Sequence, residues 1–329
     1  MRRTWLIALS MVALLSTLAV PASYAASGPT LISSCNPTYV ITQPGSYLVT
    51  QDLIAAPHTN CIDIEAANVV LDLAGHTIKR TALEGFGVGI EVFDAPAGDL
   101  PPGISGVQVT NGTIIGFAAG VNTLEAPGVI LRNLTIRDSF DYAMDVQQSD
   151  GAVVEGNNAT YSGSGIEVAF SNNVSVVGNS TSHNGSGAGV DFSDNIHIIR
   201  NTVEDNTDYG IILDSPSSYV SVVDNTIADN GDLGILVGSG TTNLLSPPPP
   251  AAVCSPTSFG TSSHNVLTRN KLTNNRVGIY LPCGAATNNT ITNNIVTGDS
   301  IVDLYDGTLG CDANLWVRNT GTRNQNCIH

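Results

Sequence analysis

Hydrophobic and polar residues alternate along most of this chain in short runs that return at a nearly fixed interval. Between about Val107 and Asn319, runs rich in Val, Ile and Thr are separated by Asn, Asp, Gly and Ser. An amphipathic helix would place apolar residues near every 3.6 positions, so this pattern predicts strands separated by turns.

An asparagine that follows a β-branched pair marks the repeats. Its members lie 22, 24, 22, 22, 24, 45, 24 and 25 residues apart, at Asn111, Asn133, Asn157, Asn179, Asn201, Asn225, Asn270, Asn294 and Asn319. A small residue followed by an aliphatic one keeps the same period, as at Gly165-Ile166, Gly189-Val190, Gly210-Ile211 and Ile301-Val302. Two markers in phase predict one coil per repeat, with equivalent residues stacked about 4.8 Å apart.

The repeated phrases, among them VTNGTI, LRNLTI and VDNTI, resemble the parallel β-helix repeats of the pectin-lyase-like superfamily, including its NosD-like and carbohydrate-associated members. The resemblance covers about Ile62 to Cys327. It implies an all-β fold, a single-stranded right-handed parallel β-helix, or solenoid, with coils of about 22 residues. It also implies a polysaccharide or cell-surface glycan as the partner, and a polysaccharide lyase or glycoside hydrolase if the protein is catalytic.

The remaining segments frame this solenoid. Residues 1–25 are predicted to be a secretory signal peptide, because Arg2 and Arg3 precede an apolar run and a small-residue cleavage site. Residues 27–61 are predicted to be an N-terminal cap, and residues 62–329 the β-helix. Inserted loops are expected at about 93–105 and 238–263, after equivalent strands and therefore on one edge, six coils apart.

Charge and cysteine content narrow the class of partner and the compartment. The chain has 28 Asp and Glu against 12 Lys and Arg, a net charge of −16, which argues against nucleic acid as a partner. No further apolar run is long enough for a membrane span, and the oligomeric state is left open. Six cysteines in an exported chain predict a secreted or periplasmic protein with disulfides. The preferred pairs join sequence neighbours: Cys35–Cys61, Cys254–Cys283 and Cys311–Cys327.

The strand that follows the second marker carries the candidate site. Its outward-facing column is predicted to be Glu91, Asn122, Asp145, Glu167, Asp191, Ile212, Leu236, Tyr280 and Asp303. Stacked like charges destabilise a sheet unless they hold a cation or serve catalysis. The candidate catalytic residues are therefore Asp145, Glu167 and Asp191, the last two also being candidate calcium ligands, and the candidate substrate contacts are Asn122 and Tyr280.

Each of these patterns has a structural alternative. The acidic column could be a solvated face of a non-catalytic cell-surface, adhesion or structural module. The asparagine column is interpreted as a ladder that stabilises a corner of each coil. The position before it supplies Arg132, Arg200, Arg269 and Arg318, which are interpreted as partners of nearby acidic residues on a strand other than that of the acidic column.

Overall fold

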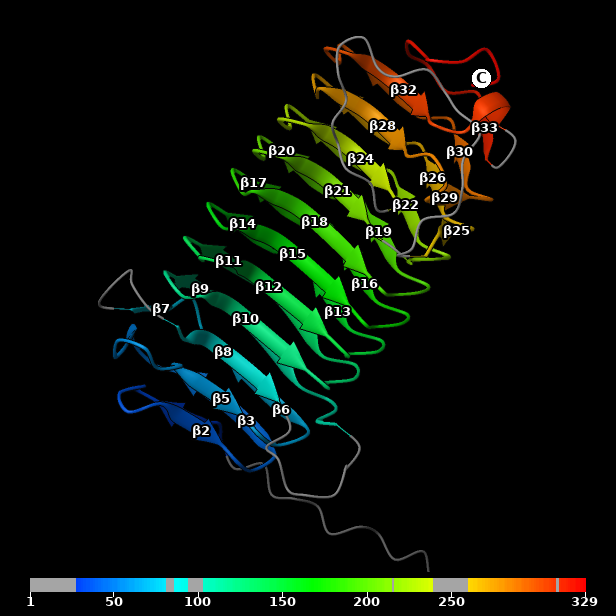
Figure 1. Cartoon of the computed structure of the whole chain (residues 1–329). Coiled ribbons are helices and arrows are strands. Elements are labelled where there is room, and N and C mark those ends of the chain that lie inside the picture. The colour runs from blue at the N-terminus through cyan, green and yellow to red at the C-terminus, as the bar shows by residue number, and fades with distance from the viewer. Residues whose placement is uncertain (1–27, 81–85, 94–102, 215, 239–259, 312–313) are drawn as a thin grey trace, which may run out of the picture.

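The strands stack in parallel, each on the equivalent strand of the neighbouring coil. The structure is a computed structural model and describes residues 28–80, 86–93, 103–214, 216–238, 260–311 and 314–329. In this part of the chain one sheet has eleven strands (Figure 1). Its strands, in spatial order, are β2 (Tyr39–Ile41), β5 (Ile62–Ile64), β8 (Val88–Phe93), β10 (Ala119–Leu124), β12 (Tyr142–Gln147), β15 (Ser164–Ala169), β18 (Ser186–Asp191), β21 (Tyr209–Leu213), β24 (Leu233–Val237), β28 (Val277–Leu281) and β32 (Val302–Asp306).

Two further stacks complete each coil and merge at the long strands β9 (Gln108–Ile115) and β11 (Ile130–Arg137), which contribute to both. The second stack contains β1 (Thr30–Ile32), β3 (Gly45–Val49), β6 (Val69–Asp72), β13 (Val153–Glu155), β16 (Ser175–Val177), β19 (His197–Ile199), β22 (Ser221–Val223), β26 (Val266–Thr268), β30 (Thr290–Thr292) and β33 (Leu315–Val317). The third contains β4 (Leu53–Ala55), β7 (Thr77–Arg80), β14 (Asn158–Thr160), β17 (Ser180–Ser182), β20 (Thr202–Glu204), β23 (Thr226–Ala228), β27 (Lys271–Thr273) and β31 (Ile295–Thr297). The short strands β25 (Ser262–Ser263) and β29 (Ala286–Thr287) pair with each other.

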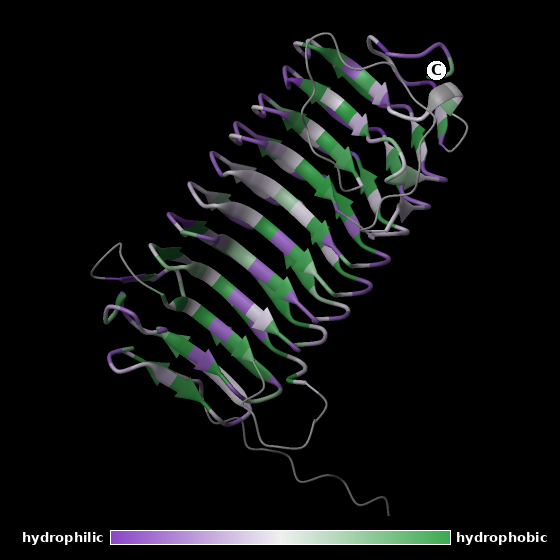
Figure 2. Ribbon diagram, in the orientation of Figure 1, coloured by the Kyte–Doolittle hydropathy of each residue, from purple (hydrophilic) through white to green (hydrophobic). Residues whose placement is uncertain are grey.

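The core runs through the middle of this stack. Inward positions such as Ile166, Val168, Ile211 and Leu213 are fully buried or nearly so, as the alternation along each strand predicts. Hydrophilic positions are interspersed among hydrophobic ones within the strands of the eleven-strand sheet (Figure 2). The predicted fold, a right-handed parallel β-helix, is confirmed.

The segment predicted to be a cap supplies the first parallel coils. Strand β1 pairs with β3, and β2 pairs with β5. A disulfide joins Cys35 to Cys61, with 4.9 Å between the Cα atoms. This predicted pair is confirmed, and it ties the first coil to the second where the stack has a neighbour on one side only. Residues 1–25 lie outside the described residues, as does most of both predicted insertions. Within the described part of the chain no helix is long and apolar enough to cross a membrane.

The predicted asparagine ladder exists, but its first two members were assigned one position away from it. In each rung the side-chain Nδ2 of one residue donates to Oδ1 of the next, at 2.9 to 3.1 Å, and the ladder consists of Asn157, Asn179, Asn201, Asn225, Asn270, Asn294 and Asn319. Asn157 Oδ1 accepts the backbone amide of Leu134, so the ladder aligns with Leu134 and not with Asn133.

Asn111 and Asn133 instead occupy the adjacent corner position, where the backbone must turn through a left-handed conformation. Their φ angles are 62° and 55°, and Arg200 and Arg269 have 53° and 56° at the equivalent place. Asparagine and glycine adopt this conformation most readily. The corner and the ladder both favour asparagine, which is why the sequence pattern confused two neighbouring columns.

A second amide ladder and a serine ladder were not predicted. The second amide ladder links Asn184, Asn206, Asn230 and Asn275 and ends on Asp299, whose Oδ1 accepts the backbone amide of Asn275 at 2.6 Å. In the serine ladder, each hydroxyl accepts the backbone amide of the preceding coil's serine, through Ser149, Ser171 and Ser193. These ladders satisfy buried polar groups at the corners of the coils.

The carboxyl group of Asp299 stands where an amide would continue the second ladder, and replacing it should stabilise the protein. Burial raises the pKa of Asp299 to about 8, opposed by the Asn275 amide and reinforced by Asp303. Between about pH 4 and 8 the unfolded chain gives up this proton while the folded chain keeps it, so stability falls as pH rises. Asp299→Asn, which cannot titrate, should raise the free energy of unfolding by about 2 kcal/mol at pH 8, allowing for partial screening by solvent, and have little effect at pH 4.

Urea unfolding at both pH values measures this difference, with the exposed Asp205→Asn, next to the same ladder, as the matched control. A gain of equal size at pH 4 and pH 8 would show that the effect does not come from ionisation of Asp299.

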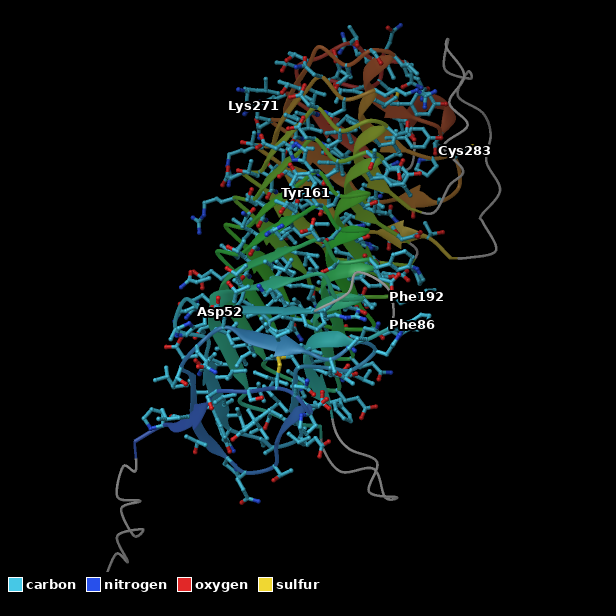
Figure 3. All side chains as sticks on the ribbon, turned by 90° about the vertical axis from the view of Figure 1, so that its left-hand side faces the viewer. Asp52, Phe86, Tyr161, Phe192, Lys271 and Cys283 are labelled. Atoms are coloured by element: carbon cyan, nitrogen blue, oxygen red, sulfur yellow. A yellow bond between two sulfur atoms is a disulfide. The ribbon has the colours of Figure 1, made fainter. Side chains whose placement is uncertain are left out.

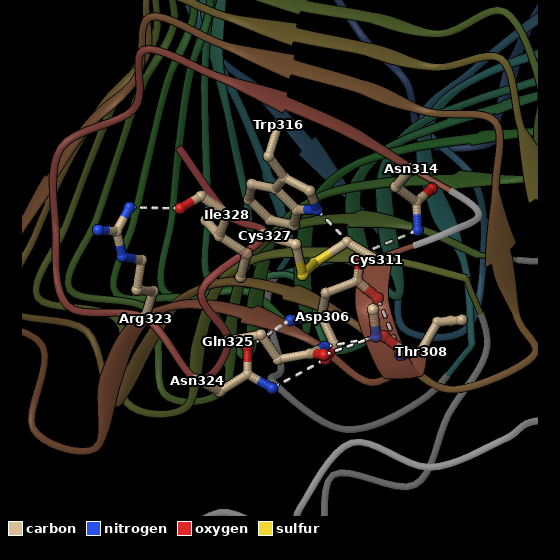
Figure 4. Close-up of a disulfide and its surroundings, with 11 residues drawn as sticks. Asp306, Thr308, Cys311, Asn314, Trp316, Arg323, Asn324, Gln325, Cys327 and Ile328 are labelled. Atoms are coloured by element: carbon tan, nitrogen blue, oxygen red, sulfur yellow. Dashed lines mark hydrogen bonds between the residues drawn. A yellow bond between two sulfur atoms is a disulfide. The ribbon is translucent and has the colours of Figure 1, made fainter.

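The last coil is closed by a second disulfide and a buried carboxylate. Cys311, in the short 3-10 helix η1 (Leu309–Cys311), is bonded to Cys327, which confirms that predicted pair. Beside it, Asp306 is fully buried and accepts the indole N–H of Trp316 at 2.9 Å (Figure 4). Of the third predicted pair, Cys254–Cys283, Cys254 lies outside the described residues. The C-terminal segment thus folds back over the final coil.

Candidate active site

The eleven-strand sheet brings the predicted acidic residues into one column on its outer face. Strand pairing places Asn122 opposite Glu91 on one side and Asp145 on the other, and places Asp145 opposite Glu167. Equivalent residues of neighbouring strands are about 4.8 Å apart. This part of the predicted column, from Glu91 to Glu167, is confirmed.

The predicted position of Asp191 in the column is wrong. Glu167 pairs with Gly189, and Asp191 lies opposite Ala169, two residues further along the strand. Asp303 is displaced in the same way, because Tyr280 pairs with Tyr305. A shift of two residues keeps every side chain on its own face, so the hydrophobic pattern could not reveal it. Asp191 is therefore a diagonal neighbour of Glu167, with Cα atoms roughly 8 Å apart from strand spacing and rise.

Gly189, the residue paired with Glu167 on the next coil, has no side chain, and the Glu167 carboxyl group occupies the space that a side chain would take there. A Cβ atom built on Gly189 would lie 2.1 Å from Glu167 Oε2 and 2.9 Å from Oε1. The Glu167 side chain therefore leans across the strand of the next coil. Because Gly189 has no side chain, this arrangement places the carboxyl group over backbone and away from bulk water.

Burial and nearby acidic residues raise the pKa values of two neighbouring carboxyl groups to different extents. Burial, reinforced by the charges of Asp145, Asp191 and Asp214, raises the pKa of Glu167 to about 8. Burial also raises the pKa of Asp145 to about 6, opposed by a hydrogen bond from Gln147 and reinforced by Asp141. At neutral pH Glu167 is consequently protonated for most of the time and Asp145 is mainly ionised.

Hydrogen bonds distinguish Asp145 from the acids below it. Asn60 Nδ2 donates to both Asp63 and Glu91, and Asn122 Nδ2 also donates to Glu91. Asp145 Oδ2 accepts from Gln147 Nε2 at 2.7 Å, but its Oδ1 is buried and has no partner among the described residues. Asn122 Oδ1 is also buried without a partner there. Two acceptor oxygens on adjacent strands thus lack a donor.

This arrangement can carry out general acid–base chemistry. A carboxylic acid beside a carboxylate of lower pKa supplies a proton donor and a proton acceptor at the same pH. The pair comes from adjacent coils, Glu167 on β15 and Asp145 on β12. Two carboxyl groups with separated pKa values are the usual machinery for cleaving a glycosidic bond.

The described residues do not offer a ready calcium site. No group of three or more His, Cys, Asp or Glu side chains in this part of the chain is placed to hold a metal ion. Calcium requires six to eight oxygen ligands, and the shift of Asp191 away from Glu167 separates the two predicted ligands. The calcium prediction therefore receives no support from the geometry of these side chains.

The structure places Tyr280 away from the acidic pair. Tyr280 lies on β28, four coils beyond β15, in an apolar group with Leu236 and Tyr305, and its side chain is only 7% exposed. Its ring is 4.9 Å from that of Tyr305. Of the two predicted substrate contacts, Asn122 therefore lies beside the carboxyl groups and Tyr280 does not.

Three residues near the site were not predicted from the sequence. The charges of Glu167 and Asp145 contribute to raising the pKa of Tyr142, after burial, which places this phenol beside them. Phe170 and Phe192 follow β15 and β18 directly, and their rings stack with centroids 5.1 Å apart and planes inclined by 3°. Their 22-residue spacing was a usable signal, because it equals one coil.

The arginines lie elsewhere and pair with acids, as predicted for two of them. Arg132 donates to Glu155 Oε2 through Nε at 2.9 Å, and Arg269 binds both carboxylate oxygens of Asp224. Arg132 lies on β11 and Glu155 on β13, which belong to the second stack.

Gly189→Ala should disturb Glu167 and little else. The three atoms nearest to an added Cβ all belong to the flexible Glu167 side chain. We expect the carboxyl group to move toward solvent, its pKa to fall toward the ordinary range, and stability to change by less than about 1 kcal/mol. Thermal unfolding and the pH profile of glycan binding measure both effects. A loss of several kcal/mol would instead show that Gly189 is needed for the packing of the sheet.

Comparisons with known proteins identify the fold. A family model described as a right-handed β-helix region matches residues 119–246. No curated protein matches the sequence. Among solved structures, the A-module of the Azotobacter vinelandii mannuronan C-5 epimerase AlgE6 is similar with a TM-score of 0.61 and 13% identity, covering 85% of this chain and 87% of that one.

The periplasmic alginate epimerase AlgG is similar with a TM-score of 0.56 and 14% identity, covering 85% of this chain and 75% of that one. The Dettilon tailspike protein gives a TM-score of 0.50 and 13% identity, covering 88% and 60%. At these identities the comparisons establish the architecture of the chain alone.

Proposed function

We propose that this protein binds an extended polysaccharide along the outer face of the eleven-strand sheet and cleaves it there, with Glu167 as general acid and Asp145 as general base. The observation that carries the proposal is the pair of stacked carboxyl groups, one with a pKa of about 8 and the other of about 6, on neighbouring coils. Groups with separated pKa values can donate and accept a proton at one pH.

The shape of the molecule supports a linear polymer as the ligand. Parallel coils present equivalent positions at intervals of about 4.8 Å, which suits a ligand that is itself a repeating chain. The names of two similar structures, a mannuronan epimerase and an alginate epimerase, refer to polysaccharides as well. The two described disulfides favour an oxidising compartment, where such polymers occur.

The proposal is tested with a panel of soluble neutral, acidic and amino-bearing polysaccharides. Affinity electrophoresis measures binding, and size-exclusion chromatography with a reducing-end assay measures cleavage. We expect at least one polymer to be retarded and shortened, and Asp145→Asn to slow shortening by about 10²–10⁴-fold. The same panel with added calcium or with a chelator tests the calcium prediction.

Binding without shortening in any arm would assign the protein to the other predicted class, a non-catalytic surface or adhesion module. The absence of binding to every polymer would overturn the proposal. The matched control is Glu204→Gln on β20, an acid-to-amide change on a different stack of strands.

A further inference from the structure

The described strands around the carboxyl pair carry acidic residues and no Lys or Arg. Strands β5, β8, β10, β12, β15, β18 and β21 contain no Lys or Arg among their described residues. They do carry Asp63, Glu91, Asp145, Glu167 and Asp191. A ligand with carboxylate or sulfate groups would bring further negative charge next to these, which is unfavourable at short range.

The same face has acceptor oxygens that lack donors. The side chain of Asp145 is 6% exposed, and its Oδ1 has no hydrogen-bond partner among the described residues. Asn122 Oδ1, on the strand paired with that of Asp145, is also buried and has no hydrogen-bond partner among the described residues. Since Asn122 Nδ2 is directed to Glu91 on the preceding coil, its Oδ1 is left for a ligand on the Asp145 side. Each such oxygen, if left without a donor, destabilises the folded chain by about 1–3 kcal/mol.

An ammonium group would both compensate the acidic charge of these strands and donate hydrogen bonds to the two acceptor oxygens. It supplies three N–H donors and no acceptor, and it carries the positive charge that the face lacks. A hydroxyl group of a neutral sugar supplies one donor and no charge. An ammonium group can therefore serve Asn122 Oδ1 and Asp145 Oδ1 together, whereas a hydroxyl can serve only one of them.

Two exposed rings that directly follow β15 and β18 form a platform for a sugar ring. Phe170 and Phe192 are 53% and 46% exposed although they stack on each other, and Phe192 lies at the edge of the molecule in Figure 3. Their φ angles of 52° and 45° are unusual for bulky side chains. Exposed aromatic faces bind the apolar face of a ring and attract cations.

We infer that the glycan bound by this face is an amino-sugar polymer whose ammonium groups are received by Asn122 and Asp145 and whose rings stack on Phe170 and Phe192. This inference rests on the proposed function and names its substrate class. It departs from the uronate polymers in the names of the similar structures, because those polymers are anionic and the described strands of this face offer no Lys or Arg to receive them.

Titration calorimetry with three hexasaccharides tests the inference on the full chain at about pH 6, where an amine is charged. The ligands are the glucosamine hexamer, the fully N-acetylated hexamer of identical linkage, and a mannuronate hexamer. We expect the glucosamine hexamer to bind at least about 10-fold more tightly than the other two, the size of one favourable charged hydrogen bond. Binding should also release protons, seen as a dependence of the heat on the buffer, because a nearby cation favours the ionised form of Asp145, whose pKa is about 6.

Two variants locate the ligand. Asp145→Asn should remove most of the preference for the glucosamine hexamer, and Phe170→Ala combined with Phe192→Ala should weaken both the glucosamine and the N-acetylated ligand. The matched control is Tyr161→Ala, which removes an exposed ring that contacts His183 at a different corner of the coil, with the ring centroids 5.0 Å apart.

The outcomes separate the two proposals. Equal affinities for the glucosamine and N-acetylated hexamers, or a preference for mannuronate, overturn the inference and leave the polysaccharide function standing. No binding by a hexamer of any class, together with no binding in the polymer panel, overturns the proposed function as well.

Discussion

Replacing Glu167 by Gln lowers the rate of polysaccharide cleavage by about 10²–10⁴-fold, the usual effect of removing a general acid or base. Gln cannot donate a carboxyl proton but has nearly the same shape, so it keeps the contact over Gly189. Binding of the polymer should change much less than turnover. The measurement is the rate of appearance of reducing ends with the polymer that the panel identifies.

The pH profile of cleavage should be bell-shaped, with one limb for each of the two carboxyl groups. Cleavage requires Asp145 ionised and Glu167 protonated, so activity should fall below about pH 6 as Asp145 gains a proton, and above about pH 8 as Glu167 loses one. The optimum therefore lies near pH 7. In Glu167→Gln the residual activity should lose its alkaline limb and keep its acid limb, and in Asp145→Asn the reverse should hold.

The control for both measurements is Glu204→Gln, which should retain the rate and the full bell-shaped profile. An unchanged rate in Glu167→Gln would remove this residue from the mechanism. An alkaline limb that persists in that variant would assign the limb to a group other than Glu167.

Replacing Asn225 by Ala should destabilise the protein by about 3–5 kcal/mol, the largest stability effect that we expect from a single substitution. Asn225 Oδ1 accepts the backbone amide of Asn201 at 2.8 Å and its side-chain amide at 3.0 Å. Asn225 Nδ2 donates to Asn270 Oδ1 and to the Ile198 carbonyl. Alanine leaves these buried groups without partners in the middle of the stack, where water cannot replace the lost bonds.

Urea unfolding and calorimetry measure this effect, and Asn158→Ala is the matched control, because Asn158 is exposed at the start of β14 next to the ladder residue Asn157. The control should change stability by less than about 0.5 kcal/mol. Because a solenoid is stabilised mainly by contacts between neighbouring coils, hydrogen exchange should show the greatest loss of protection in the coils on either side of Asn225. A loss below about 1 kcal/mol would mean that the ladder contributes little.

The carboxyl column shows how far sequence reasoning can reach in a repeat protein. The alternation of residues placed Asn122, Asp145 and Glu167 correctly on the outer face, since the side chains of a strand alternate strictly. It could not place Asp191, because moving a strand by two residues leaves the same set of side chains inside and outside. Glu167 could be predicted as a site residue, but its protonation at neutral pH could not.

The asparagine column at the corner of the coils was likewise predicted only in part from the sequence. Its period was sufficient to predict a ladder, and the ladder exists from Asn157 to Asn319. Two adjacent corner positions both favour asparagine, one for its amide and the other for its tolerance of positive φ. Only the backbone conformation separates Asn133, which turns the chain, from Asn157, which bonds to its neighbours.

By itself the sequence determined the architecture: the period, the inward and outward faces, the parallel stacking and two of the disulfides, because these follow from a regular pattern of apolar residues and from cysteine spacing. The tertiary structure decided which acids share a site and how they titrate. Those properties depend on the exact register between neighbouring coils, on the empty space above Gly189 into which Glu167 folds, and on burial, and none of these is written in the periodicity of a single chain.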